Sequence, residues 1–404
     1  MTEPIAGESV PREPYGRLFL RFLRFGLLAF GGPVAQIAMI RQELVEEAHW
    51  VSRERFNRAL AVYQVLPGPE ASELCVYFGM LSRGRLGGLL AGLGFVLPGF
   101  VLMFALSWAY ATYGIGSPLV AAVFYGCQPA VAALIVRAVH RIGAHALTDR
   151  GLWGIALAAG AGQLLGAPFA VTLSLAALAA VLCRRRHYLL AAALGLAFLA
   201  GAALVSPALA GPARADVAPE AAPGTGATLA GLFVAGLRAG LLTFGGAYTA
   251  IPFVRRDAVE VGGWMTNAQF LDGLAISGVL PAPLVIFVTF VGYLGGGPLG
   301  ALAMTAGMYL PAFAFTLIGH DVLERAIEHT ALHTILEGVT AGVVGLIGAT
   351  TLQLLPQAAG DAPRLLILLA ALLATYWWRA KAAVAAMMLG AGLAGVIVSG
   401  ALER

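Results

Sequence analysis

The sequence predicts an all-α polytopic membrane protein built from two homologous inverted-topology repeats with Gly/Pro-broken helices. Hydrophobic residues make up 59% of the 404 residues and charged residues only 11%, whereas a soluble domain carries about 25% charged residues. The apolar runs lack the alternation of apolar and polar residues found in membrane β-strands, so we expect helices, which satisfy their own backbone hydrogen bonds in lipid. The same broken pattern then occurs twice along the chain.

The repeated pattern is an apolar segment broken by glycine and followed by a turn rich in proline. Phe30-Gly31-Gly32 recurs as Phe244-Gly245-Gly246, and Leu66-Pro67-Gly68-Pro69 recurs as Leu280-Pro281-Ala282-Pro283, in each case 214 residues later. Paired apolar segments that are broken by Gly or Pro at corresponding places are the best sequence pointer to the substrate site of a transporter. Translocation is therefore the leading functional hypothesis.

Apolar segments divide the chain in order. In the first half we expect them at 17–40, 56–80, 86–113, 118–140, 151–166, 168–183 and 188–206. In the second half we expect them at 228–254, 268–293, 298–319, 333–354, 364–378 and 382–400. Between them lies a stretch rich in Pro, Ala and Gly, which predicts an extended linker. The organisation is thus an N-terminal tail at 1–16, a first membrane repeat at 17–206, a linker at 207–228 and a second membrane repeat at 229–404.

Arginines at the segment ends predict how the segments cross the membrane, because positively charged loops face the cytoplasm. With a cytoplasmic N-terminus, the arginine-bearing loops of the first half all fall inside: Arg83, Arg85, Arg141, Arg150 and Arg184 to Arg186. An odd number of crossings then leaves the linker outside, and the second repeat enters with the opposite orientation. The formal charge of +4 therefore reads as a topology signal, and we expect no nucleic-acid partner.

The first glycine break, Gly31-Gly32-Pro33, predicts a half-helix that begins inside the membrane. Glycine allows another backbone to approach closely, and proline fits the first turn of a new helix. Such a helix would point its unsatisfied N–H groups and the positive end of its dipole at an anion. The alternative is a tight helix crossing built from small residues. The second copy keeps both glycines but has Ala247 in place of the proline.

The first proline turn places two acids at the start of a helix. Glu70 and Glu73 would share one face of its first turn. They could simply complement the helix dipole at an interfacial turn. At bilayer depth, where a charge costs at least about 2.5–3.5 kcal/mol, they would instead take up and release protons. Asp272, the counterpart of Arg58, is the third candidate for proton coupling.

Arginines beside the breaks are the candidates for anion recognition, because a guanidinium offers a fixed fork of donors to an oxyanion. Arg24 and Arg238 are repeat mates just before the glycines, although each could equally be a snorkelling or ion-paired residue. Arg137 and Arg141 are interpreted as a topology anchor. The candidate substrate-binding residues are Arg24, Phe30, Gly31, Gly32, Pro33, Pro67, Gly68, Pro69, Arg238, Phe244, Gly245, Gly246, Pro281 and Pro283.

Enzymatic and metal-dependent functions find little support. Cys75, Cys127 and Cys183 are scattered in apolar stretches without a CxxC or a histidine at ligand spacing, so we expect neither a metal nor a cofactor. The sequence has no HExxH motif and no serine-nucleophile elbow, which argues against an intramembrane enzyme. A passive anion channel is the remaining distant alternative.

At these residues the chain resembles the chromate ion transporter family in its long, two-repeat form. The resemblance rests on Phe30 to Pro33, Trp50 and Leu66 to Ala71 in the first half, and on Phe244 to Gly246, Trp264 and Leu310-Pro311 in the second. One departure is Ala282, where the second proline turn of the family has glycine.

The resemblance implies an inner-membrane protein that exports chromate, with sulfate as the look-alike anion, driven by the proton-motive force. The expected partners are thus chromate, protons and the lipid bilayer. A carrier of sulfate or of another oxyanion stays open as an alternative, as does a homo-oligomeric assembly.

Overall fold

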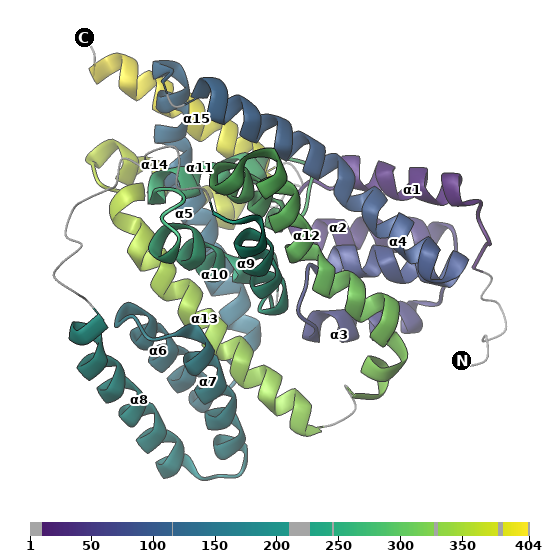
Figure 1. Cartoon of the computed structure of the whole chain (residues 1–404), viewed down its shortest axis with the longest axis horizontal. Coiled ribbons are helices and arrows are strands. Elements are labelled where there is room, and N and C mark those ends of the chain that lie inside the picture. Colours follow the sequence, from purple (N-terminus) through teal and green to yellow (C-terminus); the bar gives the residue numbers. More distant parts are fainter. Residues whose placement is uncertain are drawn as a thin grey trace.

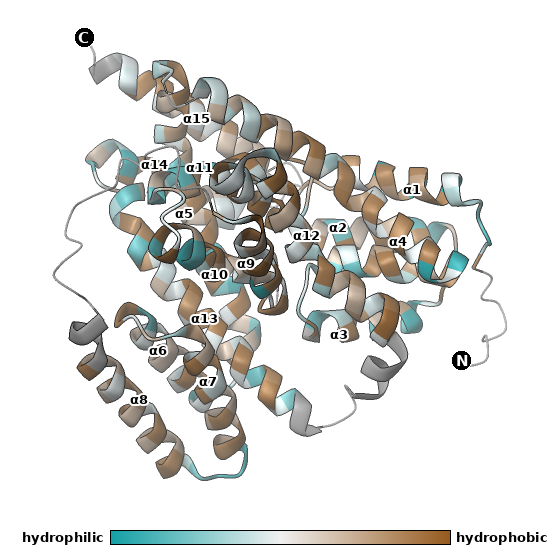
Figure 2. Ribbon diagram, in the orientation of Figure 1, coloured by the Kyte–Doolittle hydropathy of each residue, from teal (hydrophilic) through white to brown (hydrophobic). Residues whose placement is uncertain are grey.

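The computed structural model is all-α, which confirms the predicted fold class. It describes residues 10–114, 116–209, 227–244, 246–326, 330–378 and 383–402, and no β-strand occurs within these ranges. Five of the described helices are long and apolar enough to cross a membrane: Glu70–Gly114, Pro118–Ala146, Leu284–Gly319, His333–Ala358 and Ala383–Gly400. Hydrophobic residues dominate most of the ribbon, and hydrophilic residues gather in connections such as the one between α7 and α8 (Figure 2).

The described residues of the first half form eight α-helices and two π-helical turns. They are α1 (Tyr15–Leu27), α2 (Gly32–Arg41), η1 (Gln42–Glu47), α3 (Arg53–Val65), α4 (Glu70–Ala109), η2 (Tyr110–Gly114), α5 (Pro118–Ala146), α6 (Arg150–Leu164), α7 (Phe169–Arg184) and α8 (Tyr188–Leu209). The apolar segment expected at 17–40 is therefore two helices, which are separated at the glycine break. The segment expected at 56–80 is likewise divided at the proline turn.

The second half repeats this order with shorter pieces around its glycine break. They are α9 (Leu229–Leu241), η3 (Ala247–Ala250), α10 (Ile251–Arg255), η4 (Arg256–Val261), α11 (Asn267–Val279), η5 (Leu284–Ile286), α12 (Phe287–Ala326), α13 (Thr330–Ala358), α14 (Ala362–Trp377) and α15 (Ala383–Leu402). Most of the expected linker at 207–228 lies outside the described residues, as does most of the N-terminal tail.

The long helices α4 and α12 carry the same internal kink. Gly84 has φ 63° and ψ −160°, and Gly297, 213 residues later, has φ 63° and ψ −155°. Positive φ is a conformation that glycine adopts without steric cost. Each kink lets the helix fold back on itself, so that Gly79 packs against Gly87 and Gly292 against Gly300.

Close contacts between helices rest on small residues, as is usual in membranes. Gly26 of α1 lies against Pro98 of α4, and Gly240 of α9 lies against Pro311 of α12. A side chain at either glycine would collide with a backbone carbonyl of the facing helix. The two halves therefore use the same packing at corresponding places.

The two halves also exchange helices. Gly126 of α5 packs on the Ala391 carbonyl of α15, and Gly338 of α13 packs on the Ala176 carbonyl of α7. Helix α5 of the first half thus packs on α14 and α15 of the second half. Helix α13 of the second half packs on α6 and α7 of the first half, beside which it runs in Figure 1. Helix α7 packs on α13 as α15 packs on α5, so α7 corresponds to α15. Helix α8 has no corresponding helix in the described part of the second half.

Arg255 illustrates how the second half buries a charge that the first half exposes. Its guanidinium is within 2.5 Å of Glu260 and donates to Gln353 at 2.8 Å and to Asn267 at 2.9 Å, and the residue is 6% exposed. Its repeat mate Arg41 pairs with Glu46 at 3.2 Å while 42% of its side chain is exposed. A hydrogen bond from Arg53 lowers the pKa of Glu46, so Glu46 is charged at neutral pH.

These mates make a matched test of stability. We expect Arg255→Ala to lower the free energy of unfolding by about 3 kcal/mol, because it removes three polar contacts of a buried guanidinium at once. Arg41→Ala should cost about 1 kcal/mol or less, as exposed pairs do. Thermal unfolding of the two variants in detergent measures the difference. Equal shifts in Tm would contradict the expectation that Arg255 stabilises the protein more than Arg41 does.

Candidate functional site

A cavity of about 190 Å³ lies where broken segments of both halves meet. Gly31, Gly32 and Pro33 of the first glycine break form one wall. Leu280 and Ala282 of the second proline turn form another. Arg137 and Arg141 of α5 line it as well, together with Tyr248, which follows the second glycine break.

An adjoining cavity of about 390 Å³ shares Pro33, Arg141 and Tyr248 with the first. It adds Glu70, the residue after the first proline turn, and Gly246 of the second glycine break. Residues of both glycine breaks, of the second proline turn and of the helix start after the first proline turn therefore border two adjoining spaces. We call these two spaces together the arginine cavity.

Local backbone geometry aims a helix end at the arginine cavity. Gly31 has φ 88° and Gly32 has φ 77°, which reverse the chain between α1 and α2. Helix α2 then begins with Pro33 in its first turn and without a side-chain cap. Its N-terminal N–H groups and the positive end of its dipole are therefore available to an anion. In the second half, Gly246 with φ 118° precedes the short η3.

Arg137 and Arg141 give the arginine cavity its positive charge. They lie one helical turn apart on α5, so both side chains extend from the same face. Within the described part of the chain, neither guanidinium is within ion-pair distance of a carboxylate. Arg137 lies near the Tyr376 ring, 5.8 Å from its centroid. Neither positive charge is thus neutralised by a direct ion pair.

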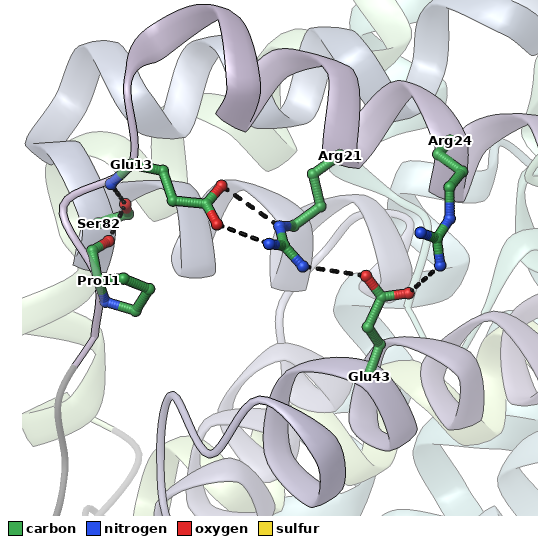
Figure 3. A network of polar contacts seen from close by, with 6 residues as sticks. All are labelled: Pro11, Glu13, Arg21, Arg24, Glu43 and Ser82. Carbon is green, nitrogen blue, oxygen red and sulfur yellow. Dashed lines mark hydrogen bonds and ion pairs between the residues drawn. The ribbon is translucent and has the colours of Figure 1, made fainter.

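Arg24 and Arg238, which sequence analysis favoured, lie outside the residues that line this cavity. Arg24 pairs with Glu43 at 2.6 Å, and Glu43 also accepts from Arg21 at 3.1 Å (Figure 3). Arg238 makes the equivalent pair with Asp257 at 3.0 Å. These arginines fasten α1 and α9 to the segments that follow the glycine breaks.

The other predicted binding residues divide into two groups. Phe30, Gly31, Gly32, Pro33 and Gly246 line the arginine cavity, whereas Pro67, Gly68, Pro69, Phe244, Pro281 and Pro283 are outside its lining. The Gly68 N–H donates to the Thr243 carbonyl at 2.9 Å, which ties the first proline turn to the second glycine break. Gly245 lies outside the described residues.

The three candidate proton-coupling acids occupy different surroundings. Glu70 lines the arginine cavity. Glu73, one turn further along α4, is 0% exposed, and neither of its carboxyl oxygens has a hydrogen-bond partner in the described structure. Asp272 lies elsewhere, where it accepts hydrogen bonds from Tyr110 at 2.8 Å and from Gln128 at 2.9 Å.

Arg137 and Arg141 are interpreted from the sequence as a topology anchor, whereas the structure places both in the lining of the arginine cavity. Their position near the end of an apolar segment is typical of a topology anchor. The signal in the sequence is their spacing of four residues, because residues four apart on a helix extend from the same face. The opposite face of this helix is almost free of charge.

Comparison with known proteins identifies the family of this chain. The family model described as Chromate transporter matches residues 16–206 and 230–396. The chain belongs to the chromate transporter family. It is thus a membrane transporter and not an enzyme, and the suspected resemblance is confirmed.

Several relatives in this family align over nearly the full length. A chromate transport protein of Pseudomonas aeruginosa is 55% identical over 97% of this chain and 94% of its own length. A chromate transport protein of Cupriavidus metallidurans is 30% identical over 89% of this chain and 88% of its own. A probable chromate transport protein of Synechococcus elongatus is 32% identical over 86% of each. No solved structure matches the chain.

Proposed function

We propose that this protein exports chromate through the arginine cavity. The observation that carries the proposal is the pair of unneutralised guanidinium groups, Arg137 and Arg141, opposite the uncapped N-terminus of α2. A tetrahedral dianion suits both kinds of donor, because arginine presents a fork of N–H groups and a helix start presents backbone N–H groups. Arg24 and Arg238 then act indirectly, by holding the segments after the breaks in place.

Packing around the long helices supports an inverted arrangement of the two halves. Gly88 of α4 lies against Leu317 of α12, and Gly92 lies against Phe313, so the second parts of these helices run antiparallel. Corresponding helices that pack antiparallel cross a bilayer in opposite directions. With the N-terminus in the cytoplasm, as the arginine distribution favours, the arginine cavity faces the cytoplasm.

The membrane potential favours export over uptake. Moving one charge through 100 mV is worth about 2.3 kcal/mol, so a dianion that leaves a negative interior gains about twice that amount. We therefore propose that the protein lies in the inner membrane, across which this potential acts. Proton antiport adds driving force and provides a way for the empty carrier to return.

We assign the proton on the cytoplasmic side to Glu70, because it shares the arginine cavity with Arg141. Glu73 would stay protonated and neutral behind Glu70, since an ionised carboxylate that is fully buried and without a hydrogen-bond partner among the described residues would be very costly. A chromate dianion and a deprotonated Glu70 would compete for the same guanidinium. Occupation of this guanidinium by Glu70 or by the anion is the step at which proton binding and anion binding affect each other.

Glu70→Gln tests this coupling in everted membrane vesicles, where export is measured as chromate uptake. We expect the variant to keep its flux but to lose the response to a pH gradient that is imposed by changing the pH of the external medium at constant luminal pH, because Glu70 faces that medium. Glu54→Gln is the matched control, because Glu54 is exposed in the first turn of α3, outside the cavity. A wild-type response to the gradient in Glu70→Gln would leave Glu70 as a helix-start residue only.

The same vesicles test the substrate. Chromate uptake by the wild type, with competition from sulfate at equal concentration, distinguishes a chromate-selective exporter from a general carrier of tetrahedral oxyanions. Absence of any chromate uptake would refute the proposed function.

A further inference from the structure

A second cavity, of about 570 Å³, opens at the other end of α5 and α11. Its walls include Tyr110, Tyr125, Gln128, Asp272 and Arg364. We call it the Asp272 cavity. Helix α5 lines this space between residues 118 and 128, and lines the arginine cavity from 134 to 146. Helix α11 does the same, with Asp272 facing one cavity and Ser277 facing the other.

A closed layer separates the two cavities. The intervening residues of α5, from Pro129 to Ala133, are all buried, as are Gly273 to Ala275 of α11. Met388 of α15 is 0% exposed and approaches α11 near Gly278. Leu134 follows Gln128 by six positions, which at 1.5 Å per residue corresponds to about 9 Å of helix. The two cavities thus lie in series across a thin barrier.

Asp272 lies at the boundary of this barrier and is held by two donors. Its Oδ2 accepts from the Tyr110 hydroxyl at 2.8 Å, and its Oδ1 accepts from Gln128 Nε2 at 2.9 Å. All three residues are buried, with exposed fractions of 5 to 7%. The Tyr110 ring is itself fixed by edge contacts with Phe124 and Phe290, at centroid distances of 5.5 and 5.0 Å.

The amide of Gln128 carries a second, unused group. Its Oε1 is buried and has no hydrogen-bond donor among the described residues. Such an orphaned acceptor is unusual, because buried polar atoms normally find partners. If Asp272 gained a proton, its hydroxyl would need an acceptor, and rotation of the Gln128 amide would present Oε1 to it.

We propose that Asp272, Tyr110 and Gln128 form the exit gate of the transporter, and that protonation of Asp272 from the Asp272 cavity opens the gate to the oxyanion. This inference rests on the proposed function. With Asp272 ionised, its negative charge repels a dianion and its two hydrogen bonds tie α11 to α5 and to η2. With Asp272 neutral, the repulsion is gone and the Gln128 contact must rearrange.

Other charged and titratable groups near Asp272 are consistent with an anion exit. Arg364 of α14 lines the same cavity, 4.2 Å from the centroid of the Tyr125 ring, and pairs with Asp361 at 3.6 Å. The Tyr125 hydroxyl donates to Asp361 at 2.7 Å. Cys127 lies buried beside the site, and the described part of α15 offers no ionisable side chain. Among the described residues that line this cavity, Arg364 is therefore the cation positioned to receive the anion beyond the gate.

The gate is tested with Asp272→Asn, which imitates the protonated carboxyl. In everted vesicles we expect its chromate uptake to be unchanged when the lumen is acidified, whereas wild-type uptake should rise several-fold. Asp149→Asn is the matched control, because Asp149 caps α6 away from both cavities and Asn caps a helix equally well. Either a wild-type response or a loss of flux in Asp272→Asn overturns the gate.

Tyr110→Phe supplies a second readout that a merely structural role would not give. The phenylalanine keeps the ring contacts but removes the hydrogen bond that stabilises the ionised Asp272. The curve of flux against luminal pH should therefore shift toward higher pH, with little change in maximal flux. An unshifted curve contradicts the role of Tyr110 in the gate.

Thiol labelling tests the two cavities without any transport measurement. In a variant whose three cysteines are replaced by alanine, Ala121→Cys would report on the Asp272 cavity and Val34→Cys on the arginine cavity. We expect a membrane-impermeant maleimide to label them from opposite faces of the membrane. Labelling from one face overturns the serial arrangement, whereas absence of chromate flux in the wild type would refute only the proposed function.

Discussion

Arg141→Ala is expected to reduce chromate transport by about 10- to 150-fold, and the double variant with Arg137→Ala to abolish it. A hydrogen bond to a charged group contributes about 1.5–3 kcal/mol, and each 1.4 kcal/mol corresponds to a factor of ten. No carboxylate in the described structure pairs with these guanidinium groups, so the loss should fall on anion binding rather than on folding. Initial rates of chromate uptake into everted vesicles, at matched protein content, measure it.

Two further variants sharpen this test. Arg85→Ala removes an exposed arginine that lines neither the arginine cavity nor the Asp272 cavity, and it should transport like the wild type. Arg141→Lys should give an intermediate rate, because lysine keeps the charge but lacks the fork of donors. Normal rates in both Arg137→Ala and Arg141→Ala would place the binding site elsewhere.

Gly68→Ala is expected to destabilise the protein by about 1–3 kcal/mol and to lower transport with it. Gly68 has φ 155°, and a Cβ there would lie 2.8 Å from Glu73 Oε1 and 2.9 Å from the Ala312 methyl. The turn would have to open, which would strain the hydrogen bond from Gly68 to Thr243. Thermal unfolding in detergent and vesicle flux report the two effects.

The second proline turn provides the matched control, since it has alanine at the corresponding position. The Ala282 methyl fills the space in front of Gly99, where a second Cβ would collide with it. Ala282→Gly therefore removes only packing, at a cost of about 1 kcal/mol. Equal losses from Gly68→Ala and Ala282→Gly would show that the two turns do not differ in this way.

Much of the architecture could be predicted from the sequence because it depends on local chemistry. Glycine and proline weaken a helix locally, and their recurrence at corresponding places made the breaks at Gly31 and Gly246 and the turn at Pro67 visible in the repeat. The departure at Ala282 was visible as well. The structure then explains why the first proline turn has glycine and the second has alanine at the corresponding position. Gly68 faces Glu73, whereas Ala282 faces Gly99, which leaves room for a methyl group.

The arginines show why the rest could not be predicted. Arg24 and Arg238 are close in sequence to the glycine breaks, but their ion pairs with Glu43 and Asp257 depend on how the chain folds back after the break. Arg137 is more than a hundred residues from Gly31 in the chain, and the two meet only through tertiary packing. A repeat reveals which residues correspond, whereas it does not reveal which of them meet.

The exchange of helices between the halves limits how this transporter can move. Rocking one half as a rigid block would pull α5 from α15 and α13 from α7, where glycine lets the backbones touch. The parts that can shift are instead the short pieces at the breaks, α2, η3 and α11, which end next to the cavities. We therefore expect opening and closing to consist of small shifts of these short segments, while α5, α7, α13 and α15 keep their packing.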